Sequence, residues 1–164
     1  MDWTPFIAPG FTLAGVLSGV FITHRLSSNR FIKEKLWEQR REAYSQIISS
    51  VVNMSECTTR IVEGYGENPV QFHNSEYRDK VNDEMWAHWK EAKACFASNA
   101  LIVSERFGNK MVDLMAFVKD VGSDPNEVMP EWIDSLRDRL KADVDALMAI
   151  GANELMPAGK RRGA

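Results

Sequence analysis

The chain of 164 residues contains an uncharged block, Trp3 to Thr23, in which twenty-one consecutive residues carry no ionisable side chain. An α-helix of this length reaches roughly 30 Å, which matches the hydrocarbon thickness of a bilayer. The residues that follow the block are rich in charge, as in an ordinary soluble domain. The block therefore predicts a transmembrane helix over residues 1–24, followed by one helical domain.

Two other interpretations of the uncharged block are weaker. A secretory signal peptide has a basic segment before its apolar run, whereas Asp2 is the only charged side chain ahead of this block. A buried helix of a soluble protein would fit Pro9-Gly10 and the short purely apolar part, Phe6 to Ile22. Such a helix normally keeps a polar face, and this block has none. We therefore expect a membrane span that is not cleaved.

The charges on either side of the block predict its orientation. No Lys or Arg precedes it, and six follow within about twenty residues; basic residues stay on the cytoplasmic side. We expect an inner-membrane protein with its N-terminus outside, a cytosolic helical domain over residues 25–152 and a flexible basic tail over residues 153–164. The basic residues expected at the membrane surface are Arg25, Arg30, Lys33 and Lys35.

Charge differs along the cytosolic part. Residues 24–46 contain six basic and three acidic side chains, while residues 56–154 contain eleven basic and nineteen acidic ones. The basic segment can attract anionic lipid headgroups, at about 1 kcal/mol for each residue near the surface. The acidic remainder argues against nucleic acid as a partner, because nucleic-acid binding needs a basic surface.

The first helix is expected to continue beyond the membrane. Neither Gly nor Pro occurs between Val20 and Glu63, so the sequence predicts one long helix, straight or bent near Ser27-Ser28-Asn29. Its apolar positions recur at spacings of three and four and form a broad stripe, which favours packing into a bundle over a two-stranded coiled coil. The turn cluster Gly64 to Pro69 ends this helix. The stripe comprises Leu36, Trp37, Ala43, Tyr44, Ile47, Ile48, Val51, Val52, Met54, Ile61 and Val62.

Three further helices complete an all-α bundle of about four helices. The second covers about Ser75–Ser98, the third includes Leu101 and Ile102 with Gly108 as a weak point, and the fourth begins beside Pro130 and ends at Gly151. The expected core residues of the second helix are Tyr77, Val81, Met85, Trp86, Trp89, Ala92 and Phe96. Those of the third and fourth are Met111, Leu114, Met115, Val118, Ile133, Leu136, Leu140, Val144, Leu147 and Met148.

No motif for catalysis, metal or cofactor binding occurs in the sequence. The three histidines are isolated from one another, and there is no HExxH, P-loop, dinucleotide turn or GxSxG. Glu84 and His88 share a helix face, an arrangement expected of a surface ion pair. The thiols of Cys57 and Cys95 are far apart in sequence, and a cytosolic domain keeps them reduced. We expect a protein that is not an enzyme and needs no cofactor.

Small residues gather on one half of the uncharged block. Gly15 and Gly19 form a GxxxG pattern, and Gly10, Ala14 and Ser18 form an adjoining row on the helix. Leu13, Val16, Leu17 and Val20 occupy the other half. Small residues let helix backbones approach closely within a membrane, so these five positions predict self-association of the spans. A symmetric ring is one possible product.

The segment Lys35-Leu36-Trp37-Glu38-Gln39-Arg40-Arg41-Glu42-Ala43-Tyr44 follows an N-terminal span and precedes a helical hairpin. This arrangement resembles small bacterial single-pass proteins, and it is similar in architecture to membrane effectors of CRISPR and other phage-defence systems. The resemblance implies assembly through the spans and damage to the membrane. It leads to one hypothesis, a homo-oligomeric pore-forming or membrane-perturbing effector, and leaves open a second, a membrane-tethered adaptor that docks a cytosolic protein partner.

Overall fold

A computed structural model describes the backbone of residues 4–121 and 131–155, and the side chains of residues 31–121 and 132–155. All regular structure within these residues is α-helical, which confirms the expected all-α class. The helices are α1 (Thr4–Glu67), α2 (Pro69–His73), α3 (Glu76–Ser98), α4 (Glu105–Asp120) and α5 (Glu131–Leu155).

Helix α1 extends over 64 residues without interruption and passes through Ser27, Ser28 and Asn29. This confirms the prediction of one long helix. The chain divides into two compact units, Met1–Glu38 and Gln39–Ala164, so α1 contributes to both. Across the part of the chain described with side chains, no helix is long and apolar enough to cross a membrane. The predicted span, residues 1–24, lies outside that part.

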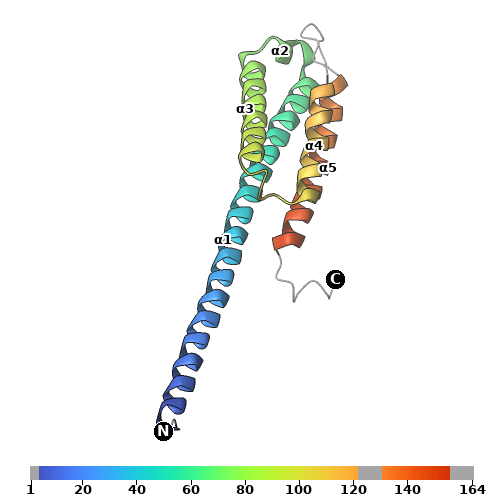
Figure 1. The fold of residues 1–164 in the computed structure, drawn as a ribbon. Coiled ribbons are helices and arrows are strands. Elements are labelled where there is room, and N and C mark those ends of the chain that lie inside the picture. Colours follow the sequence, from blue (N-terminus) through green and yellow to red (C-terminus); the bar gives the residue numbers. More distant parts are fainter. Residues whose placement is uncertain (1–3, 122–130, 156–164) are drawn as a thin grey trace. The chain divides into compact units, whose positions relative to one another are not determined.

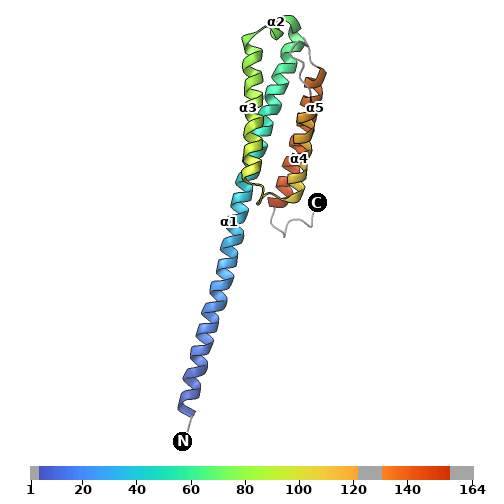
Figure 2. The same cartoon turned by 45° about the horizontal axis from the view of Figure 1, so that its top comes forward.

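The second unit is a helical bundle. Its helices α3, α4 and α5 lie alongside the C-terminal part of α1, as both views show (Figures 1 and 2). All four long helices contribute side chains to one apolar core. The residues with no exposed surface include Ile47, Val51, Met54, Met85, Ala92, Phe107, Met111, Leu114, Leu136, Leu140 and Leu147.

Local capping signals account for the helix starts within the bundle. The side chains of Ser75 and Ser104 accept hydrogen bonds from the backbone N–H groups of Arg78 and Phe107, both at 3.1 Å. Asn68 caps α2 in the same way, and Pro69 follows as its first residue. Each cap satisfies a backbone donor that the first turn of a helix leaves unpaired. The α3 boundaries, Glu76–Ser98, agree closely with the prediction.

Two helix boundaries differ from the prediction. Leu101 and Ile102 were expected in the third helix, but they belong to the connection before α4, where Leu101 is fully exposed. Ser104 starts α4 instead, and Gly108 lies inside it without ending it.

Helix α5 does not stop at Gly151 but continues to Leu155. No glycine within the described residues has a positive φ, so Gly151 lacks the left-handed geometry that commonly ends helices. Pro130, expected to begin the helix, lies outside the described residues.

Four residues expected in the core are more exposed than predicted. Tyr77 is 52% exposed because it lies in the first turn of α3, and Met148 on α5 is 45% exposed. Leu36 and Trp37 are 47% and 43% exposed, because the buried stripe of α1 begins only at Ala43. The remaining stripe positions are buried or packed against the core.

Candidate functional site

A hydrogen-bond cluster joins α1, α4 and α5 at Tyr44. The Tyr44 hydroxyl donates to Oε2 of Glu154 at 2.5 Å and accepts from the backbone N–H of Ser104 at 3.1 Å. The Ser104 hydroxyl donates to Oε1 of Glu154 at 2.6 Å. The Tyr44 ring stacks on Phe107 with centroids 4.2 Å apart. Burial, together with the Glu154 hydrogen bond and charge, raises the pKa of Tyr44. We call Tyr44, Ser104 and Glu154 the tyrosine cluster.

The tyrosine cluster also borders the connection between α3 and α4. Nε of Arg40 donates to the Ile102 carbonyl at 2.7 Å. Two side chains of α1 therefore hold this connection and the start of α4. Since both carboxylate oxygens of Glu154 are engaged by hydroxyl donors, the arrangement favours a structural role that ties α1 to the bundle.

A second polar group is buried between α4 and α5. Asp143 is 1% exposed, and its carboxylate lies 2.5 Å from Nζ of Lys110 and 2.8 Å from Nε of Arg139. The guanidinium of Arg139 also lies over the Phe117 ring, 5.2 Å from its centroid. A buried carboxylate needs such partners, because removing it from water is otherwise costly. Two cations engage Asp143 directly, so this group resembles an internal ion pair more than a ligand site.

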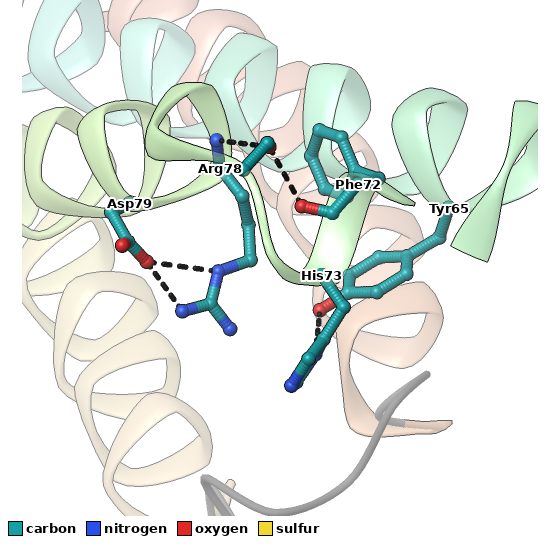
Figure 3. Close-up of polar contacts among 6 residues, drawn as sticks. Tyr65, Phe72, His73, Arg78 and Asp79 are labelled. Carbon is teal, nitrogen blue, oxygen red and sulfur yellow. Dashed lines mark hydrogen bonds and ion pairs between the residues drawn. The ribbon is translucent and has the colours of Figure 1, made fainter. Parts of the chain in front are cut away.

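The third polar region lies where α1, α2 and α3 meet (Figure 3). Tyr65 from α1 and Nδ1 of His73 from α2 share a hydrogen bond of 3.3 Å. Arg78 pairs with Asp79, and this hydrogen bond raises the pKa of Arg78. The Tyr65 ring packs edge-on against Phe72, with centroids 4.9 Å apart. Tyr65 thus connects α1 to α2, and the Phe72 ring connects α2 to Tyr77 on α3, with centroids 6.2 Å apart.

An open cavity of about 430 Å³ lies beside this region. Arg60 at its edge pairs with Glu84 on α3 at 3.3 Å and donates to the Cys57 sulfur at 2.9 Å. Burial raises the pKa of the Cys57 thiol despite the nearby guanidinium, so this thiol is a poor nucleophile. The cavity is lined by Arg60, Glu63, Gly64, Glu67, Asn68, Gln71, Phe72, Ser75 and Tyr77.

The structure gives new partners to one pair that the sequence placed together. Glu84 and His88 were expected to pair with each other, but Glu84 contacts Arg60 and His88 lies 3.7 Å from Glu91.

Trp89 is buried, Trp86 is half-buried against the core, and Lys93 lies over the Trp89 ring. The tryptophans are therefore core residues, as predicted. Cys57 and Cys95 are not joined to each other.

The sequence-predicted membrane residues lie largely outside the described side chains. This holds for Gly10, Ala14, Gly15, Ser18, Gly19, Arg25 and Arg30, whose positions on α1 are helical. Lys33 and Lys35 are described and exposed. Four apolar neighbours are exposed as well: Phe31, Ile32, Leu36 and Trp37.

Sequence reasoning found Tyr44 as an inward residue but missed its partners. Ser104 precedes an acidic first turn, which is a recognisable helix-start signal. Glu154 gave no comparable signal, because Tyr44 and Ser104 lie far away in the chain. Asp143 follows Arg139 by four residues, a spacing typical of helix ion pairs, but its other partner, Lys110, lies on another helix. Among the residues described with side chains, no group of three or more His, Cys, Asp or Glu could hold a metal ion. Compared with protein families, curated proteins and solved structures, the chain matches none.

Proposed function

We propose that the chain is a homo-oligomeric, single-pass inner-membrane protein whose cytosolic bundle controls a pore or another membrane-perturbing assembly. The observation that supports this role best is the continuity of α1. One helix contains the uncharged block near its start and supplies core residues such as Ile47, Val51 and Met54 near its end. A rearrangement of the bundle can therefore act on the span through a single helix backbone.

The proposed topology places the N-terminus outside and the bundle in the cytoplasm. Arg25 and Arg30 would then lie nearest the anionic headgroups, where each basic residue contributes about 1 kcal/mol. The exposed Lys33 and Lys35 would lie farther out, where the attraction is weaker. The spans associate through the small-residue half of the block. We assign no catalytic activity and no cofactor to the protein, since the sequence contains no motif for either. The resemblance to phage-defence effectors supports antiviral defence as its setting.

Mass measurement in a mild detergent tests the assembly. We expect a particle whose protein mass is a multiple of 18.6 kDa, and a shift toward a single chain in the Gly15→Leu and Gly19→Leu variants. Leucine at either glycine prevents the close approach of helix backbones that small residues allow. Val16→Leu on the other half of the block is the matched control and should leave the mass unchanged. A wild-type protein that is monomeric and leaves the membrane potential unchanged on expression would refute the proposal.

A second candidate function is a membrane-tethered adaptor, and the cavity beside α1, α2 and α3 favours it. Glu63 and Glu67 line this cavity together with Tyr77, which is 52% exposed. Val70 on α2 is 65% exposed. An exposed aromatic side chain bordered by carboxylates suits a basic segment of a cytosolic partner. In this function the span serves as an anchor.

A further inference from the structure

Four large apolar side chains of the unit Met1–Glu38 are exposed within seven residues of α1, and Trp37, at 43%, is the least exposed of them. Phe31 is 67% exposed, Ile32 is 51% exposed and Leu36 is 47% exposed. Single exposed apolar residues are common, but a group of them on one short segment indicates a contact surface. The bundle core contains none of the four.

Helix geometry relates these residues to the small-residue half of the uncharged block. Eighteen residues correspond to about five turns of α-helix, and α1 is helical throughout this stretch. Ile32 therefore lies in line with Ala14, and Leu36 lies in line with Ser18. Phe31 lies in line with Leu13, on the other half. Ile32 and Leu36 thus continue the row expected to face a neighbouring span, and Phe31 does not.

Lipid is poorly placed to cover Ile32 and Leu36. They follow Thr23, the end of the uncharged block, by about 13 Å and 20 Å along the helix. The headgroup region adds only about 5–8 Å on each side of the hydrocarbon core, and a typical tilt of about 20° shortens these heights only slightly. In the proposed topology both side chains therefore lie in the aqueous phase beyond the headgroups, so lipid does not cover them.

We propose that Ile32 and Leu36 contact the same residues of a second copy of this chain, in a parallel helix contact just outside the membrane. The proposal rests on the proposed membrane span. Because every copy then enters the membrane in the same direction, equal residues lie at equal heights. A second copy is the occupant that continues the contact of the spans, whereas an unrelated partner would need a matching helix at this height.

Cysteine cross-linking in native membranes tests the proposal. We would use the full chain with Cys95→Ala, in which the remaining native thiol, Cys57, is fully buried. Ile32→Cys and Leu36→Cys should form disulfide-linked dimers on mild oxidation, because a disulfide requires Cα atoms within about 7 Å. Phe31→Cys and Glu34→Cys are the matched controls on the other side of the helix, and they should remain largely monomeric. Ser18→Cys reports separately on contact between the spans.

The outcomes separate this proposal from the proposed function. Cross-linking at residues 32 and 36, with little at 31 and 34, supports the contact. Cross-linking at residue 18 but not at 32 or 36 overturns it and leaves the assembly of spans intact. Equal cross-linking at all exposed positions overturns it as random collision. No cross-linking anywhere, with a monomeric mass, overturns both this contact and the proposed assembly of spans.

In detergent, Leu36→Ser should weaken association roughly tenfold, while Phe31→Ser should not.

Discussion

Tyr44 on α1 contacts both α4 and α5. Its hydroxyl joins Glu154 and the Ser104 backbone, and its ring stacks on Phe107. Tyr44→Phe keeps the ring and removes both hydrogen bonds. We expect the free energy of unfolding to fall by about 1–2 kcal/mol at neutral pH, because the groups left behind are part-buried. Urea unfolding of the full chain in mild detergent, followed by circular dichroism, measures this change.

The same substitution should alter the dependence of stability on pH. Burial and Glu154 raise the pKa of Tyr44 above its ordinary value of 10.0. Above that value the unfolded chain has released this proton and the folded protein has kept it, so stability falls as pH rises toward the pKa of the folded state. The difference between wild type and Tyr44→Phe should therefore shrink above about pH 10. A constant difference between about pH 8 and pH 11 would contradict this assignment.

At the residue scale, the sequence predicts apolar burial better than polar pairing. The stripe from Ala43 to Ile61 follows from helical periodicity, since each position repeats on one face of α1. The pairing of Asp143 with Arg139 fits the i, i+4 spacing of a helix, but its pairing with Lys110 and both hydrogen bonds of Glu154 do not follow from periodicity. Lys110 lies on another helix, and Ser104 lies fifty residues before Glu154. A local pattern contains no information about which side chains meet across a bundle.

At the element scale, both boundaries of α3 and the end of α1 were predicted well, whereas the start of α4 and the end of α5 were not. Ser75 is a local signal that satisfies a backbone donor, and α3 starts there as predicted. Pro69 was expected only as part of a turn, and in the structure it begins the short helix α2. A glycine often marks the end of a helix, but Gly151 lies inside α5. A Cβ atom added to Gly151 would lie 3.4 Å from Cδ2 of Tyr44. The small size of Gly151 therefore lets α1 pack closely against α5. This reason for a glycine is visible only in the packed structure.

The end of α1 supplies a matched pair of glycines for a test. A Cβ atom on Gly64 would overlap the Phe72 ring, whereas a Cβ atom on Gly66 meets nothing within 4 Å. Gly64→Ala should lower the free energy of unfolding by about 1–3 kcal/mol, because Phe72 must leave its position against Tyr65. Gly66→Ala should leave stability unchanged or raise it by up to about 1 kcal/mol. Thermal melting of both full-length variants measures the contrast, and equal effects would refute this packing.

At the scale of the whole molecule, the two candidate functions differ in what they require of the uncharged block. An effector needs the block for assembly, and an adaptor needs it only as an anchor. Replacing residues 3–23 by a leucine-alanine helix of equal length removes the small-residue half and keeps the anchor. Helices in lipid associate through close packing rather than through a hydrophobic drive, so this exchange should separate the two functions.

The control for this exchange restores five positions in the new helix: Gly10, Ala14, Gly15, Ser18 and Gly19. If the protein perturbs the membrane through assembled spans, the plain leucine-alanine helix should abolish the loss of membrane potential on expression, and the restored helix should recover it. A potential-sensitive dye in intact cells provides the measurement, with membrane insertion of each variant verified by fractionation. If both exchanged proteins act like the wild type, the block is an anchor and the adaptor function holds, because no feature beyond apolar length is then required of it.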